Sequence, residues 1–381
     1  MKDAQPPAAN QYRRQEEPDE PEGGINQPSD EPWSNYPIDT LLIRTESRTV
    51  HDILRRISQG AVIMDPDFQR DFVWNDEKQS KLIESVLMRI PLPVFYLAED
   101  RDGNLIVVDG LQRLATFRRF VTEKQFRLKL PDQPELDKKR FEELSPKLRN
   151  RVEDCQLTLY VIDSQVPEKA RLDIFDRVNS GEPLTRQQMR NALYQGAATD
   201  FLKSQAQHRL FETVTGKSLN RKKMFDREFV NRYCAFSLTS YNEYRDMDEF
   251  LARALETINA DPSICSQLEQ GLRTSLKNNQ HAFGVHAFRK HQPGAERRSV
   301  LNASLWDVMS TGLAHVSQLL LKERLTDFQN AFYELLDDPE FERSITYGPN
   351  TPKQVRHRFD TAHLMLSELF PEMSIAGFTQ T

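Results

Sequence analysis

The chain has 381 residues and a mass of 44.4 kDa, with 38% hydrophobic and 28% charged residues, so it is long enough for about two domains with apolar cores. Lysine and arginine total 51 against 57 aspartates and glutamates, and this net charge of −6 excludes a uniformly basic nucleic-acid-coating protein. Cys155, Cys234 and Cys265 form no CxxC pair, which argues against a disulfide framework or a structural zinc. The sequence has neither a signal peptide's apolar segment nor an apolar run of the roughly 18 residues that a membrane helix needs. We therefore expect a cytoplasmic protein without a membrane partner.

Residues 1–35 are predicted to form a disordered, acidic, proline-rich leader. They contain six prolines, eight acidic residues and three basic ones, with almost no apolar side chains. Such a segment buries too little surface to offset the entropy of ordering it. The remaining 346 residues carry 48 basic and 49 acidic residues, so the rest of the chain is close to neutral.

From residue 36 to about 200 the apolar spacing predicts a mixture of helices and strands. In chain order we expect a helix over 49–58, a helix opened by Asn75, a hairpin of strands 94–97 and 105–108, a helix from 111, a strand over 156–163, and helices over 167–178 and 184–194. From 201 to 381 only helical patterns stand out, at 228–238, 247–258, 304–321 and 325–336. The sequence thus predicts an α+β domain over 36–200 and an all-helical domain over 201–381.

The strongest candidate site is the run Asp109-Gly-Leu-Gln-Arg113, at the junction of the predicted strand and helix. The first turn of a helix presents unpaired amides, and Gly110 lets a phosphate approach the backbone closely. Arg113 can add a charged bidentate donor, and Asp109 can hold a magnesium ion or orient a water molecule. Strand–glycine–helix junctions are also common in purely structural roles, so both interpretations stay open.

Three further residues are weaker candidates. Gln69 and Arg70 lie among aromatic residues, where a buried arginine needs an anionic partner, so Arg70 is a second candidate phosphate ligand. A surface ion pair with a neighbouring aspartate is the alternative. Asn179 lies in an Asn-Ser-Gly turn between two helices, where Asn and Gly are also ordinary turn residues.

Four separated motifs occur in an order that resembles the N-terminal domain family of GmrSD-type restriction proteins. They are Phe68-Gln-Arg with Val73-Trp74, Gln79 to Pro93, Val108-Asp-Gly-Leu-Gln-Arg-Leu114, and Phe175-Asp-Arg-Val-Asn-Ser-Gly181 with Arg190-Asn-Ala192. The later stretches 226–236, 287–289 and 302–306 also resemble members of this family, so the resemblance extends over about residues 38–365.

The resemblance implies a ParB/sulfiredoxin-like core, with a small mixed sheet and helices followed by the helical domain, and a setting in defence against foreign DNA. It also implies a DGQQR-type motif for nucleoside triphosphate hydrolysis, with magnesium expected beside the nucleotide. By that correspondence Asp109, Gly110, Gln112 and Arg113 form the functional motif, with Gln69 and Arg70 beside it. Leu111 stands where the family has its first Gln, so any contact from that side chain is lost.

Longer relatives in the family carry an HNH nuclease, and His357 and His363 lack its flanking residues. We therefore expect an NTP-hydrolysing sensor or regulator that works with a separate nuclease or modification subunit. A non-enzymatic DNA-binding protein with a relic motif and a nuclease acting through the ParB-like core are the alternatives. DNA is a candidate partner, and the basic clusters that could bind it lie at 138–151, 220–223 and 289–298.

Overall fold

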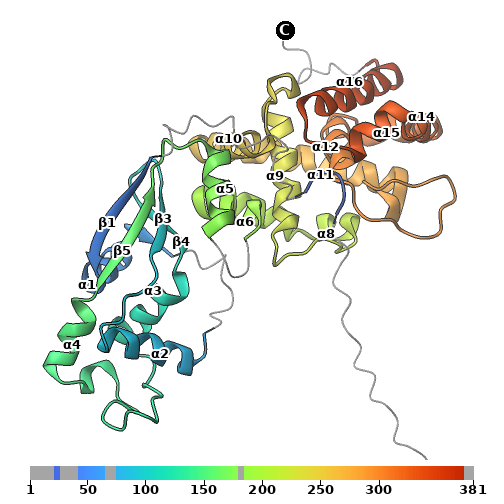
Figure 1. The fold of residues 1–381 in the computed structure, drawn as a ribbon. Coiled ribbons are helices and arrows are strands. Elements are labelled where there is room, and N and C mark those ends of the chain that lie inside the picture. The colour runs from blue at the N-terminus through green and yellow to red at the C-terminus, as the bar shows by residue number, and fades with distance from the viewer. Residues whose placement is uncertain (1–20, 26–41, 65–73, 179–183, 373–381) are drawn as a thin grey trace, which may run out of the picture.

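The computed structural model describes residues 21–25, 42–64, 74–178 and 184–372. Along this part of the chain a five-stranded sheet with its helices comes first, and helices alone follow it (Figure 1). The α+β fold class expected from the sequence is confirmed.

The described strands form one mixed sheet in the order β1-β5-β3-β4-β2. Its strands are β1 (Ile43–Thr49), β2 (Val62–Ile63), β3 (Phe95–Glu99), β4 (Leu105–Asp109) and β5 (Gln156–Ile162). The pairs β1/β5 and β3/β4 are antiparallel, whereas β3/β5 and β2/β4 are parallel. β1 and β2 were not predicted. β1 is a polar edge strand that pairs with β5 along its whole length, and β2 has only two residues.

The β3–β4 hairpin was predicted, and its turn has a local cause. The Asp100 carboxylate accepts hydrogen bonds from the backbone N–H groups of Asp102 at 2.9 Å and Asn104 at 2.8 Å. Gly103 has a φ of 82°, a backbone conformation that side chains disfavour. The turn therefore fixes the start of β4, and this strand ends at Asp109.

Helices cover both faces of the sheet. Leu97, Val107 and Leu159 belong to one core, and their neighbours in sequence point to the other face. The first core is closed by α1 (Val50–Ser58), α2 (Asp76–Leu87), α3 (Leu111–Phe117) and α4 (Pro146–Glu153). The second core is closed by α5 (Glu168–Val178) and α6 (Arg186–Leu193). The result is three layers, with the sheet in the middle.

The second half of the described chain has its own core around Trp306, which is fully buried. The helices that form it are α7 (Ala197–Ala206), α8 (Arg209–Thr215), α9 (Phe225–Leu238), α10 (Met247–Ala260), α11 (Cys265–Phe283), α12 (Ala303–Gly312), α13 (Gln318–Glu323), α14 (Leu325–Asp337), α15 (Pro339–Thr346) and α16 (Pro352–Leu369). The helix predicted over 304–321 is two helices, α12 and α13, and α11 was not predicted. None of the helices in the described part combines the length and apolar character needed to cross a bilayer.

Buried ion pairs join α6 to the helices that follow. Asp248 of α10 accepts hydrogen bonds from both Arg186 and Arg190, and all three side chains are nearly inaccessible. Arg227 of α9 donates to Asn191 at 3.0 Å. Arg190 and Asn191, which carried part of the family resemblance, therefore dock α6 against α9 and α10.

Residues 21–25 differ from the disordered leader expected over 1–35. The Glu22 N–H donates to the Leu301 carbonyl at 2.9 Å, and the Glu22 carbonyl accepts from the Ala303 N–H at 2.8 Å. The Asn350 amide donates to the Gly24 carbonyl at 2.8 Å. This short segment is held through its backbone, so its lack of apolar side chains does not prevent docking.

Candidate functional site

The motif Asp109–Arg113 lies where β4 ends and α3 begins. Asp109 is the last residue of β4, and Gly110 forms the N-cap of α3 in a left-handed conformation with a φ of 96°. No side chain caps this helix, because the N-cap residue is a glycine. The helix runs on from Phe117 into a π-helical turn over Arg118–Thr122. The strand–glycine–helix geometry expected from the sequence is therefore present.

The packing around Gly110 explains why a glycine stands there. A Cβ atom at this position would lie 2.3 Å from Cδ1 of Phe95, in addition to the strained φ. Phe95 is fully buried in the first core. Gly110 is thus required by the close approach of β3, whether or not a phosphate also approaches here.

Arg113 is 9% exposed, and its contacts lie within the protein. Its guanidinium donates to Asp109 Oδ2 at 2.8 Å, to the Val94 carbonyl at 3.0 Å and to the Pro93 carbonyl. It also lies over the Phe95 ring, 4.2 Å from its centroid. Burial lowers the pKa of Arg113, and the Asp109 carboxylate opposes that shift. The contacts make Arg113 a residue that positions Asp109 and the start of β3.

Asp109 keeps access to solvent, because its side chain is 35% exposed in the ion pair with Arg113. A carboxylate held in this way can accept a metal ion or a water molecule on its exposed side. No group of three or more metal-ligating side chains occurs in the part of the chain that the structure describes.

The remaining predicted site residues are only partly placed. Gln112 is half-buried, and its carbonyl accepts a hydrogen bond from Thr116 at 2.8 Å. Gln69, Arg70 and Asn179 lie outside the described residues.

The described residues next to those gaps pack beside the motif's own strand and helix. Met64 and Trp74 pack against the core that contains Leu111, and Val178 and Leu184 pack against the core that contains Val108. Leu111, the departure from the family motif, is 8% exposed in the first core.

A link between α2 and the π-helical turn that follows α3 was not singled out from the sequence. The side chain of Gln79 donates to the Trp74 carbonyl at 2.9 Å and accepts from Arg119 at 3.0 Å. Gln79 is 1% exposed, so this link is part of the buried structure next to the motif helix. The sequence shows these residues as an ordinary helical Gln and Arg, because their pairing depends on how the two helices cross.

The basic clusters proposed for nucleic acid differ in exposure. Arg289 is fully buried and donates to the carbonyls of Thr215 and Ser299, so it cannot contact DNA in this fold. Around α4, in contrast, Lys147 and Arg151 line a hollow of about 430 Å³ together with Arg89. This hollow is a basic surface that the structure leaves accessible.

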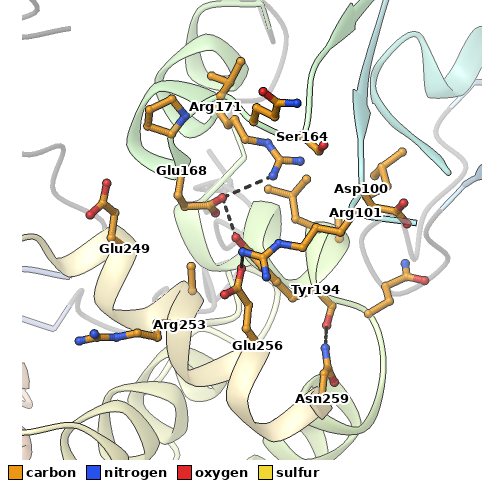
Figure 2. Close-up of a pocket in the computed structure, with 18 of the residues that line it drawn as sticks. Asp100, Arg101, Ser164, Glu168, Arg171, Tyr194, Glu249, Arg253, Glu256 and Asn259 are labelled. Atoms are coloured by element: carbon orange, nitrogen blue, oxygen red, sulfur yellow. Dashed lines mark hydrogen bonds and ion pairs between the residues drawn. The ribbon is translucent and has the colours of Figure 1, made fainter. Parts of the chain in front are cut away.

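A large cavity lies at the opposite end of β4 from Asp109. It has a volume of about 1030 Å³, and its lining comes from the β3–β4 turn, the start of α5, the end of α6 and one side of α10 (Figure 2). Asn104, just before β4, is in the lining, whereas Asp109 is not. We call it the α5–α10 cleft.

Comparison with known proteins identifies the class of domain. Residues 50–195 match the family model described as the GmrSD restriction endonuclease, N-terminal domain. This stretch is therefore similar to that N-terminal domain, as the order of the motifs in the sequence indicated. No curated protein and no solved structure matches significantly. The match ends before α7, so the resemblance of the later motifs stays a prediction.

Proposed function

We propose that the protein binds a nucleoside triphosphate with magnesium, hydrolyses it, and acts as the sensor or regulatory component of a DNA-restriction system. The observation that carries the proposal is the junction of β4 and α3, where the half-exposed Asp109 carboxylate is held by a buried arginine at an uncapped helix start. A carboxylate, the amides of a helix start and a nearby cation are what a metal–phosphate group needs.

In this proposal Asp109 binds the magnesium ion or orients the attacking water, and the amides after Gly110 face the phosphates. Arg113 supports the site by fixing Asp109, since its guanidinium donates hydrogen bonds to Asp109 and to the two carbonyls that precede β3. Gln112, Gln69, Arg70 and Asn179 remain candidate nucleotide contacts. Magnesium supplies charge neutralisation of the phosphates.

The test separates binding from hydrolysis. Asp109→Asn keeps size and removes charge, so it should abolish phosphate release while leaving metal-free binding of a non-hydrolysable triphosphate nearly unchanged. Calorimetric titration with and without magnesium and a phosphate-release assay measure the two effects. Asp200→Asn, an exposed aspartate on α7, is the matched control. If the Asp109 variant hydrolyses nucleotide at the wild-type rate, the site assignment is wrong.

Arg113 gives a second readout of the same site. Arg113→Lys keeps the charge but cannot hold Asp109 and two carbonyls in one planar fork. We expect hydrolysis to fall at least tenfold, and thermal melting to show whether the fold is kept. Wild-type hydrolysis in a folded Arg113→Lys protein would contradict the positioning role.

DNA binding is a second candidate function, favoured by the hollow that Arg89, Lys147 and Arg151 line. We expect DNA affinity that falls steeply with salt and is weakened by the double variant Arg89→Glu and Lys147→Glu, which reverses two charges of this hollow. Nucleotide turnover under magnesium separates the enzyme from a purely DNA-binding protein. DNA cleavage is expected from a separate nuclease subunit.

A further inference from the structure

The α5–α10 cleft has the size of a ligand site and an excess of negative charge. Its volume of about 1030 Å³ is at the upper end of ordinary small-molecule sites. The described side chains that line it include seven carboxylates and four guanidinium groups. Arg101 is paired with Glu256 across the cleft at 2.6 Å, whereas Glu249 stands exposed on the α10 wall. The electrostatic balance favours a cationic occupant.

A buried carboxylate in the lining has an oxygen without a partner. Glu168, at the start of α5, is 8% exposed, and its Oε2 accepts a hydrogen bond from the Tyr194 hydroxyl at 2.8 Å. Its Oε1 is buried and has no hydrogen-bond partner among the described residues. Figure 2 shows this carboxylate between α5 and α10, directed toward Arg171 and Tyr194.

Arg171 does not satisfy that oxygen. Its Nη1 lies 3.8 Å from Glu168 Oε2, beyond hydrogen-bond distance, and its Nη2 donates to the Glu99 carbonyl at 3.0 Å. Burial raises the pKa of the Glu168 carboxyl, and the cations nearby only oppose that shift. Buried acceptors in native proteins almost always have a donor. A donor supplied by a ligand would complete this one.

We propose that the α5–α10 cleft binds a small amine or guanidine cation, and that the Glu168 side chain turns toward it so that the buried Oε1 accepts its N–H group. The remaining carboxylates of the lining stabilise its charge. Because one wall belongs to the β3–β4 turn and another to α10, the bound cation links the sheet to the helical half of the chain. The site is distinct from the proposed nucleotide site at the other end of β4.

Calorimetric titration of the full chain with spermidine and with agmatine, at constant ionic strength and without nucleotide, tests the proposal. At least one of the two should bind saturably at one site. Glu168→Gln keeps the size of the side chain and its contact with Tyr194 but removes the charge, so affinity should fall roughly ten- to a hundredfold. Glu340→Gln, an exposed glutamate on α15, is the matched control and should bind like the wild type.

Glu249→Lys keeps the test decisive if Glu168→Gln fails to fold, because this exposed wall position places a like charge in the cleft. It should weaken binding several-fold. Saturable binding that is unchanged in the folded cleft variants, or no saturable binding of either cation, overturns the proposal. Binding of a lysine-rich peptide in place of both small cations also overturns it, in favour of a protein partner. Since no nucleotide is present, the outcome is independent of the proposed hydrolysis.

Discussion

At the scale of single residues, the structure explains the residue type at several motif positions by packing and hydrogen bonding, independently of any catalytic role. Gly110 is confined by Phe95, and Arg113 bridges Asp109 to the carbonyls before β3. Only Asp109 of these offers a charged group to solvent. The motif therefore combines residues that fix the geometry of the strand–helix junction with one residue whose charge is accessible to a ligand.

Gly103 and Gly110, which lie on either side of β4, give a matched prediction about stability. Gly110→Ala should destabilise the fold by roughly 2–4 kcal/mol, since it adds steric overlap with Phe95 to the left-handed strain. Gly103 has a similar φ of 82°, but no atom lies within 4 Å of an added Cβ. Gly103→Ala should therefore lower the free energy of unfolding by only about 1–2 kcal/mol. Urea unfolding measures both. Equal losses would show that packing against Phe95 contributes nothing.

His363 of α16 predicts a pH dependence of stability. Burial among Tyr241 and Phe359 lowers its pKa from 6.5 to about 4. The folded state disfavours the protonated form of His363. The stability of the folded protein that depends on a neutral His363 is therefore fully present above pH 6.5 and is lost as the pH falls toward about 4. The loss should be roughly 3 kcal/mol over that window.

Urea midpoints measured between pH 4 and pH 7 check this expectation. His363→Gln should flatten the decline, whatever its effect on stability at neutral pH. His51→Gln, an exposed histidine on α1, controls for removing a surface histidine. An undiminished acid-side slope in the His363 variant would contradict the assignment.

At the scale of elements, the second half of the chain is organised around buried charges as well as apolar packing. Asp307 of α12 accepts a bidentate pair from Arg232 of α9, at 2.8 and 2.7 Å, and a further bond from Arg358 of α16 at 2.8 Å. All three side chains are fully buried. Such clusters need their geometry complete, which makes the packing of these helices specific.

Removing Asp248 should uncouple α6 from α10. Asp248→Ala leaves Arg186 and Arg190 buried without their shared carboxylate, which should destabilise the protein by about 3–5 kcal/mol. Asp327→Ala, at an exposed position of α14, is the control. Thermal melting and hydrogen exchange of α6 measure the effect, and a loss within 1 kcal/mol would show that the ion pairs do not hold this helix.

At the scale of the whole molecule, residues from the start of the described chain complete a surface formed some 280 residues later. Ser304 donates to the Gly23 carbonyl at 3.2 Å, next to the Glu22 contacts, and Lys290 lies 3.3 Å from the Glu22 carboxylate. The start of α12 thus depends on a segment remote in sequence.

Deleting residues 1–25 should lower the stability by roughly 2–4 kcal/mol, because several backbone hydrogen bonds to the start of α12 are lost. Deleting residues 1–20 removes none of these contacts and should leave the melting temperature nearly unchanged. Calorimetric melting of both truncations decides the point. Identical melting of the two proteins would mean that the Glu22 bridge contributes no stability.

Sequence alone determined the elements whose residues carry a local signal. The helix after Asn75 was predicted because its cap and first-turn acids act within a few residues, and the β3–β4 hairpin because its strands and turn are contiguous. The motif's place at a strand end followed for the same reason. The order of this motif among the others was enough to predict the family-model match over residues 50–195.

Features that depend on residues far apart in sequence became visible in the tertiary structure alone. The sequence of β1 is that of a polar segment, and its strand structure depends on pairing with β5. Residues 21–25 have the composition of the leader, but the Glu22 backbone hydrogen-bonds to Leu301 and Ala303 at the start of α12. The hydrogen bonds from Arg113 to the carbonyls of Pro93 and Val94 join residues about 20 positions apart, so the sequence did not indicate them. Backbone pairing and buried charge are long-range interactions, so local composition cannot reveal where a group finds its partner.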